Sequence, residues 1–204
     1  LVAVRQAGVS LDSRQHDALA WTDRIEQCVA PVLLALWEAT GHVDRRELMG
    51  TRDAKIPDQV IKGLKELGAL GMKIPEEYGG IGLSVSQEVQ VNFELGRTAP
   101  AFRSVFGTNI GIGSQGILMD GTPEQKATYL PRVASGELIM SFALTEPDVG
   151  TDAASLKTRA ELDGEHYVLN GTKRYITNAP RAGAFTLMAR TGGPGAIGVS
   201  AFIV

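Results

Sequence analysis

The sequence contains one cysteine, Cys28, and three histidines among its 204 residues. A single cysteine excludes an internal disulfide, and the scattered His16, His42 and His166 have no ligand spacing, so no metal site is predicted. Basic residues are not in excess, because 20 lysines and arginines stand against 23 aspartates and glutamates. The net charge of −3 therefore gives no reason to expect binding to nucleic acid or to an anionic membrane surface.

Long apolar runs are also missing. A membrane-spanning helix needs roughly 18 apolar residues, whereas the best stretch, Val29 to Trp37, is short and contains Pro31. With no signal peptide and one cysteine, we expect a reducing compartment, the cytoplasm or, in a eukaryote, the mitochondrial matrix. The chain begins at Leu1 rather than at methionine and ends in an apolar strand, so we interpret it as a fragment of a longer protein.

The first two thirds of the sequence show the apolar periodicity of helices. Thr122 and Gln125 form a capping box with Pro123 at the first helical position, and Ser84 and Gln87 form another. We predict helices over residues 11–39 with a kink or break at Pro31, and over residues 57–68, 84–97 and 122–132.

Residues 102–119 mix apolar side chains with Gly107, Gly111, Gly113 and Gly116. Each glycine weakens a helix by up to about 1 kcal/mol relative to alanine, so close approach to the backbone is expected here. Tight packing between helices and a ligand groove both explain this pattern. The residues alone leave the two explanations open.

Beyond Gly136 the sequence has short alternating runs that are typical of strands, separated by turn residues that include Asp163-Gly164 and Asn170-Gly171. The predicted strands cover residues 138–144, 156–161, 166–170, 173–177, 185–190 and 197–204. Helices followed by strands indicate an α+β chain, which we divide into a helical domain, residues 1–136, and a β-domain, residues 137–204.

Two polar clusters follow apolar strands, at residues 145–152 and 175–178. An apolar strand end beside a polar loop suits a flat cofactor. A purely structural alternative is that Thr145 and Asp152 cap turns and Tyr175 fills the core. These residues alone do not decide between the two explanations. The acids around Pro147 lack the spacing of a calcium loop, and residues 192–195 lack the lysine of a phosphate loop, so we interpret the latter as a flexible hairpin tip.

Residues 142–152, Phe-Ala-Leu-Thr-Glu-Pro-Asp-Val-Gly-Thr-Asp, and residues 170–178, Asn-Gly-Thr-Lys-Arg-Tyr-Ile-Thr-Asn, resemble the two flavin-binding segments of the acyl-CoA dehydrogenase family. Further similarity at residues 74–80, 121–126 and 129–131 extends the resemblance from about residue 57 to the end. It implies an N-terminal all-α helical domain and a β-barrel-like middle domain in this chain, with the family's C-terminal four-helix domain absent from it.

The resemblance implies α,β-dehydrogenation of a fatty acyl-CoA with FAD as cofactor, an electron-transfer flavoprotein or similar acceptor, and a homodimer or homotetramer. Substrate contacts would come from Thr151, Gly113 and Gly116, and the similarity of residues 113–122 to long-chain and very-long-chain members implies a deep acyl pocket. The implied FAD-binding residues are Phe142, Leu144, Thr145, Gly150, Thr151, Tyr175, Ile176 and Thr177.

Three departures accompany this resemblance: Tyr175 replaces the tryptophan of many members, Thr151 replaces serine, and Asp148 adds a negative charge that must point to solvent. The catalytic glutamate is expected in the C-terminal domain, so no catalytic residue is predicted here. Glu146 is not taken as the base, and the 204-residue chain alone is expected to be inactive. An acyl-CoA oxidase or related flavin monooxygenase, and a non-catalytic acyl-CoA-binding homologue, are the alternatives.

Overall fold

A computed structural model describes residue 56 and residues 58–95 and 100–204. The predicted helix over residues 11–39, together with Cys28, His16 and His42, lies outside the described residues. The described helices and helical turns are α3 (Asp58–Glu66), η1 (Ala69–Gly71), η2 (Glu76–Tyr78), α4 (Val85–Leu95), α5 (Pro100–Thr108), η3 (Asn109–Gly113), α6 (Gln115–Asp120) and α7 (Pro123–Ala134).

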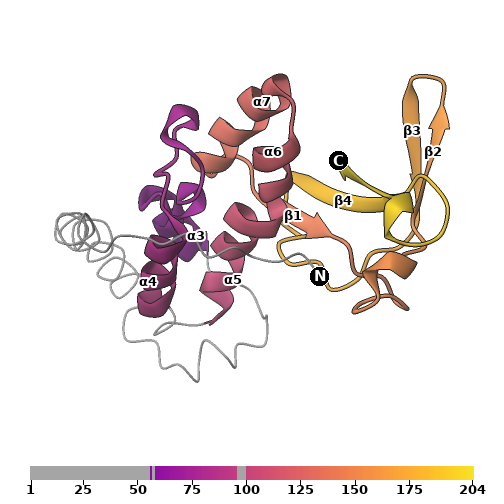
Figure 1. Cartoon of the computed structure of the whole chain (residues 1–204). Coiled ribbons are helices and arrows are strands. Elements are labelled where there is room, and N and C mark those ends of the chain that lie inside the picture. The colour runs from indigo at the N-terminus through magenta and orange to yellow at the C-terminus, as the bar shows by residue number, and fades with distance from the viewer. Residues whose placement is uncertain (1–55, 57, 96–99) are drawn as a thin grey trace, which may run out of the picture.

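The strands follow the helices in the chain, as the α+β prediction requires, with two helical turns between them. The strands are β1 (Met140–Ala143), β2 (Arg159–Asp163), β3 (His166–Asn170), β4 (Ala184–Arg190) and β5 (Val199–Ile203). The helical turns are η4 (Ala153–Ser155), before β2, and η5 (Ala196–Gly198), before β5. Figure 1 shows the helices gathered on one side, β1 beside them, and the β2–β3 hairpin at the opposite end of the molecule. Within the described residues no helix is long and apolar enough to cross a membrane.

The capping box predicted at Thr122 is complete, and one of the two bonds of the box predicted at Ser84 is present. The Thr122 hydroxyl accepts a hydrogen bond from the Gln125 backbone N–H at 3.2 Å, and the Gln125 side chain accepts one from the Thr122 N–H at 2.9 Å, which completes the capping box of α7. At the start of α4 the Ser84 N–H donates to Gln87 Oε1 at 2.7 Å. These bonds satisfy N–H groups that a helix start otherwise leaves without partners.

Residues 102–119 form two helices rather than one, because the π-helical turn η3 lies between α5 and α6 and Gly111 has non-helical backbone angles. A Cβ added at Gly113 would lie 2.7 Å from the Thr108 carbonyl oxygen and 3.0 Å from Met140 Cβ. Close packing against β1 thus accounts for glycine at 113. Gly116 differs, since its nearest neighbour would be Thr186 Cγ2 at 3.7 Å, and it borders a hollow of about 170 Å³.

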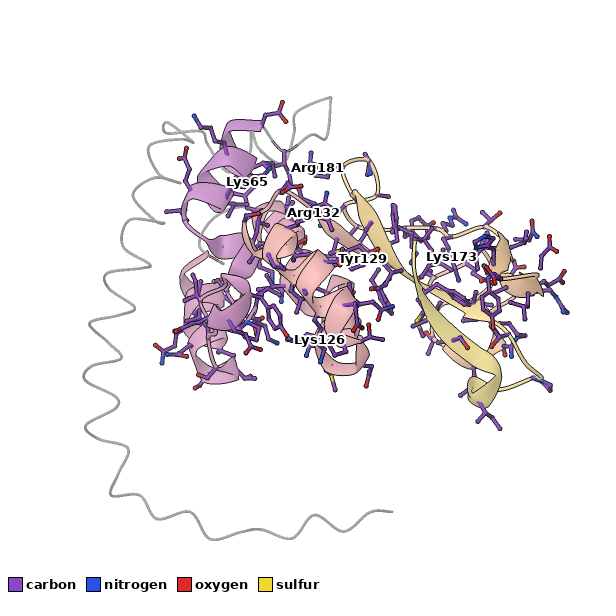
Figure 2. All side chains as sticks on the ribbon, turned by 90° about the horizontal axis from the view of Figure 1, so that it is seen from above. Lys65, Lys126, Tyr129, Arg132, Lys173 and Arg181 are labelled. Atoms are coloured by element: carbon purple, nitrogen blue, oxygen red, sulfur yellow. The ribbon has the colours of Figure 1, made fainter. Side chains whose placement is uncertain are left out.

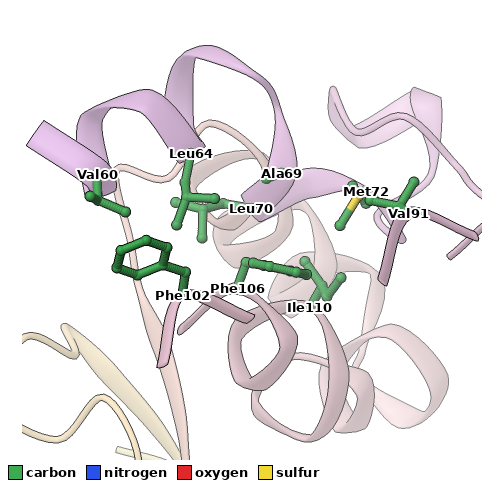
Figure 3. Packing of buried hydrophobic residues seen from close by; sticks show 9 residues of the cluster. All are labelled: Val60, Leu64, Ala69, Leu70, Met72, Val91, Phe102, Phe106 and Ile110. Atoms are coloured by element: carbon green, nitrogen blue, oxygen red, sulfur yellow. The ribbon is translucent and has the colours of Figure 1, made fainter. Parts of the chain in front are cut away.

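Two apolar clusters hold the helices together and attach them to the sheet. In the first, Val60 and Leu64 of α3 lie over Phe102 and Phe106 of α5 (Figure 3). Burying a side chain of this size contributes roughly 1.5–3 kcal/mol. The second cluster joins α6 and α7 to the strands and contains Ile74, Ile117, Leu130, Val133, Ala134, Leu138, Met140 and Ala184.

The sheet has five strands in the order β1-β4-β2-β3, with β5 paired to β4. β1 and β4 are parallel, with Met140 opposite Ala184, while β2–β3 and β4–β5 are antiparallel pairs. The Asp163-Gly164 hairpin is confirmed, and Gly164 has the positive φ of 61° that this turn favours. The segment that follows β1 leads to β2, which begins with Arg159 opposite Arg190, and β3 ends with Asn170 opposite the same Arg159. The segments that follow β1 and β3 therefore approach each other near the start of β2.

The predicted strand at residues 173–177 and the hairpin turn at Asn170-Gly171 are wrong. Asn170 is the last residue of β3 and pairs with Arg159, whereas residues 171–177 have no strand pairing, and Tyr175 and Asn178 have φ angles of 57° and 68°. Left-handed angles are uncommon for residues other than glycine and interrupt an extended strand. Residues 173–177 are therefore a loop, whose contacts are described next.

Candidate cofactor site

The two polar segments that the sequence singled out lie side by side. The Arg174 N–H donates to the Thr145 carbonyl at 2.8 Å, and the Lys173 ammonium donates to the Leu144 carbonyl at 2.9 Å. A third bond runs from the Ser141 hydroxyl to the Thr177 carbonyl. We call residues 142–152 the first loop and residues 171–178 the second loop. Their hydrogen bonds make them one continuous surface beyond the end of β1.

The carboxylate of Glu146 lies at the centre of the first loop and is almost fully buried, with 6% of the residue exposed. Its Oε2 accepts from the Lys157 N–H at 2.7 Å, and its Oε1 accepts from the Thr158 N–H at 2.9 Å and the Thr158 hydroxyl at 2.5 Å. Lys173 Nζ lies 2.9 Å from the same Oε1. Figure 2 places Lys173 among the side chains of the sheet, apart from Lys65 and Arg132 on the helices.

This environment determines the charge of Glu146. Burial by itself raises the pKa of the carboxyl group. The hydrogen bonds from Lys173, Thr158 and the Lys157 backbone have the opposite and larger combined effect, and they lower the pKa to about 2. An anion that is so strongly stabilised is a poor proton acceptor near neutral pH. The structure therefore agrees with the interpretation that Glu146 is not the catalytic base.

Asp148 points to solvent, as the sequence analysis required. Its side chain is 72% exposed and lies 2.8 Å from the Lys157 ammonium. The lysine offsets the negative charge of Asp148, although an exposed pair of this kind contributes little to stability. The Asp148 carboxylate raises the pKa of Lys157 by hydrogen bonding and by charge.

The second loop is anchored from its far end by Asn178. The Asn178 side-chain amide donates to the Val105 carbonyl on α5 at 2.9 Å and to the Met140 carbonyl on β1 at 3.4 Å. These bonds hold Asn178 in its left-handed conformation and leave Tyr175 78% exposed. The Arg174 guanidinium carbon lies 4.4 Å from the centre of the Tyr175 ring. Tyr175 therefore does not fill the core, so that part of the structural alternative is wrong.

The residues assigned to FAD by resemblance all belong to this surface. Phe142, Leu144, Thr145 and Ile176 are half-buried, while Gly150, Thr151, Tyr175 and Thr177 are exposed. Phe142, Leu144 and Ile176 are thus partly covered apolar residues, whereas Tyr175 has an exposed ring and the hydroxyl-bearing Thr151 and Thr177 are exposed. Asp152 precedes η4, but its side chain makes no capping bond to the backbone of that turn; its carboxylate accepts a hydrogen bond from the Ser155 hydroxyl at 2.5 Å instead, so the capping role that the structural alternative gave to Asp152 is wrong.

Sequence reasoning missed Arg190, whose guanidinium connects the segment that follows the first loop, residues 154–156, to the β4–β5 hairpin. It donates to the carbonyls of Leu156 at 3.1 Å, Ala154 at 2.6 Å, Gly193 at 2.5 Å and Gly195 at 3.1 Å. The hairpin at residues 192–195 is as predicted, but its glycine carbonyls are bound by this arginine. Beside these groups lies a hollow of about 730 Å³ that Lys157, Arg159 and Arg190 help to line.

Gly171 allows the second loop to approach Thr158. A Cβ added there would lie 2.3 Å from the Thr158 hydroxyl oxygen and 2.7 Å from its Cα. We expect Gly171→Ala to lower the free energy of unfolding, measured in urea, by about 1–3 kcal/mol, because the backbone must shift. Gly193→Ala, where a Cβ meets nothing within 4 Å, is the control and should change it by less than about 0.5 kcal/mol. Equal effects of the two substitutions would contradict the prediction.

Comparison with known proteins places the whole arrangement in one family. The model of the acyl-CoA dehydrogenase N-terminal domain matches residues 35–137, and that of the acyl-CoA dehydrogenase middle domain matches residues 141–204. The (2S)-methylsuccinyl-CoA dehydrogenase of Cereibacter sphaeroides is 45% identical over 140 residues, which are 69% of this chain and 25% of that protein. The mitochondrial very long-chain specific acyl-CoA dehydrogenase of Rattus norvegicus is 42% identical over 139 residues, 67% of this chain and 21% of that protein.

Solved structures give the same result. The crystal structure of an acyl-CoA dehydrogenase complexed with FAD from Bacillus anthracis matches with a TM-score of 0.73 and 36% identity, over 89% of this chain and 31% of that one. The chain thus spans between 21% and 31% of the length of these three proteins. Since the two family models together match most of its residues, the chain belongs to the acyl-CoA dehydrogenase family.

Proposed function

We propose that this protein dehydrogenates an acyl-CoA thioester between its α and β carbons, with FAD bound across the first and second loops. The observation that carries the proposal is the joining of these loops by hydrogen bonds between Thr145 and Arg174, Leu144 and Lys173, and Ser141 and Thr177. The family membership and the relatives named as dehydrogenases support the reaction type. The Bacillus anthracis relative complexed with FAD supports the cofactor.

The residues present fit a flavin. Half-buried Phe142, Leu144 and Ile176 form an apolar floor, and the exposed Tyr175 ring can pack on a flat aromatic system. Thr145 and Thr177 would offer hydroxyls to the polar edge of the ring, and Gly150 leaves the backbone of the first loop open, with nothing within 4 Å of an added Cβ. When bound, FAD supplies the acceptor for the hydride that leaves the β carbon.

The CoA part of the substrate fits the polar end of the first loop. Thr151 is exposed and lies close in the chain to Ala154, where the hollow of about 730 Å³ begins. Lys157, Arg159 and Arg190 line this hollow and carry charge opposite to that of the CoA phosphates. We therefore assign Thr151 to both cofactor and substrate, and the hollow to the phosphate-bearing part of CoA.

For the acyl part we propose a long chain, with Gly113 and Gly116 beside it, as the resemblance of residues 113–122 implies. Gly116 is the better supported of the two, because it borders the hollow of about 170 Å³. Gly113 is packed against Met140, and the methylsuccinyl-CoA relative is 45% identical, so a short branched acyl group is the second candidate. Rates with a series of acyl-CoA thioesters from four to eighteen carbons would separate the two.

Several features of the whole protein belong to the same proposal. An electron-transfer flavoprotein or a similar acceptor would reoxidise the flavin, the assembly would be a homodimer or homotetramer, and the location would be the cytoplasm or the mitochondrial matrix. The base would be a glutamate outside these 204 residues, and the boundary between helical and β-domains would lie near Gly136.

An acyl-CoA oxidase is the alternative that keeps the flavin. Hydrogen peroxide formation during turnover, instead of dye reduction, would favour an oxidase.

Flavin binding tests the proposal directly. The intact protein should show flavin absorbance when purified or after FAD is added, and a lack of flavin absorbance in both cases would overturn the proposal.

We expect Tyr175→Ala to raise the Kd for FAD, measured by flavin fluorescence, by about three- to tenfold, because an aromatic contact is lost. Tyr167→Ala on β3 removes another exposed tyrosine, outside both loops, and should leave the Kd unchanged.

A further inference from the structure

We propose that Glu146 and Lys173 form a positioning pair, which sets how the first and second loops lie against each other and thereby the shape of the floor under the cofactor. The inference rests on the proposed function, since it names the residues that keep that site in order. Neither side chain is placed to touch the cofactor, because 4% of the Glu146 side chain and 10% of the Lys173 side chain are exposed. Both act through their neighbours.

The bonds of Lys173 show how the pair connects the loops. Its ammonium lies 2.9 Å from Glu146 Oε1 and 2.9 Å from the Leu144 carbonyl oxygen, so one group of the second loop holds two points of the first. Glu146 directly follows Thr145, and Lys173 is two residues before Tyr175. A change in the pair is therefore transmitted to an apolar, a hydroxyl and an aromatic member of the proposed FAD surface.

Glu146 also extends the connection beyond the two loops. Through Lys157 and Thr158 its carboxylate fixes the chain that enters β2, and Thr158 in turn binds the Arg190 backbone N–H through its carbonyl at 2.7 Å. One carboxylate thus connects the first loop, the second loop and the β2–β4 junction. Its acceptor positions are occupied by four donors, which restricts it to one orientation.

The burial of this pair sets it apart. Among the ion pairs of the described residues it is the most buried, whereas Lys157–Asp148 in the same region is exposed on both sides. Removing two charges from water is costly, and an apolar pair of similar volume is often as stable. A buried pair that gains little stability over apolar side chains, yet connects the two loops of the site, is better explained by the geometry it imposes.

The experiment compares Glu146→Gln, Lys173→Met and the double variant in the intact protein, with Asp148→Asn as the control. Asp148→Asn removes the exposed ion pair of the same loop and leaves the buried one intact. Hydrogen exchange without FAD is the first measurement. The Arg174 amide, which bonds the Thr145 carbonyl, should exchange at least tenfold faster in all three variants, while the Leu138 amide, bonded to Arg132 outside the loops, should not change.

Binding of FAD is the second measurement. We expect the Kd to rise by about tenfold or more in the single variants and in the double variant, and to stay unchanged in Asp148→Asn. The double variant is decisive, because it has no unpaired buried charge and so folds even where a single variant does not. If it binds FAD like the unchanged chain, or keeps slow exchange at Arg174, the positioning role is wrong.

The two arms also separate this inference from the proposed function. If the intact, unchanged protein does not bind FAD, the proposed function fails, while the exchange of the Arg174 amide still decides whether the pair orders the loops. If FAD binds but Arg174 exchange is the same in every variant, the pair fails and the proposed function stands.

Discussion

Replacing Asn109 with leucine is expected to lower the free energy of unfolding by roughly 2–6 kcal/mol. Asn109 is fully buried in the turn between α5 and α6. Its amide N–H donates to the Leu70 carbonyl at 3.0 Å, and its carbonyl accepts from the Met140 N–H at 2.7 Å. Leucine can make neither bond, so two buried backbone groups lose their partners at about 1–3 kcal/mol each.

Urea unfolding measures this loss. Asn170→Leu makes the same substitution at an exposed position of β3 and should change the free energy of unfolding by less than about 0.5 kcal/mol. A loss below about 1 kcal/mol for Asn109→Leu would show that the turn finds other partners. Because Met140 begins β1, which leads directly into the first loop, the same variant should also weaken FAD binding if the proposed function holds.

The parts of the fold that follow from local chemistry were predictable. Thr122 and Gln125 start α7 because their side chains satisfy nearby N–H groups, and Asp163-Gly164 forms a hairpin because glycine adopts the required positive φ. Such signals lie within three residues of each other. Their outcome depends little on the rest of the molecule.

The errors arose where distant residues override local preference. Residues 173–177 alternate as a strand does, yet Lys173 and Arg174 form hydrogen bonds with the first loop. Lys173 and its partner Leu144 are 29 positions apart in the sequence. Asn178 forms a hydrogen bond with α5. Similarly, nothing local in the glycines of residues 102–119 reveals that Met140 packs on Gly113. Spatial neighbours of this kind cannot be read from the spacing of residues along the chain.

For the site, the sequence identified the two loops, and their proximity is confirmed. It did not reveal what Lys173, Asn178 and Arg190 do, because these are common polar residues whose roles depend on burial and partners. A lysine two residues before an exposed tyrosine gives no local sign that it is paired with a buried glutamate. Residues that touch a ligand are thus easier to predict than those that position them.

Lowering the pH from about 4.5 to about 2 is expected to remove about 3 kcal/mol of stability through Glu146 alone. The folded-state pKa of this carboxyl is about 2, below its ordinary value of 4.5, because Lys173, Thr158 and the Lys157 backbone stabilise the anion against the opposing effect of burial. Between these pH values the unfolded chain binds a proton that the folded chain does not. The contribution is therefore complete above about pH 4.5 and is lost as the pH falls to about 2.

Other carboxyl groups titrate in the same range, so the test is a difference between two proteins. The free energy of unfolding of the unchanged chain minus that of Glu146→Gln should be largest near pH 6 and should fall by about 3 kcal/mol by pH 2. Asp148→Asn removes the exposed ion pair of the same loop and is the control, which should change the free energy of unfolding near pH 6 by less than about 1 kcal/mol. A pH-independent difference for Glu146→Gln would mean that the carboxylate is not held as an anion. The ionic contact between the loops would then be absent, and hydrogen bonds alone would join them.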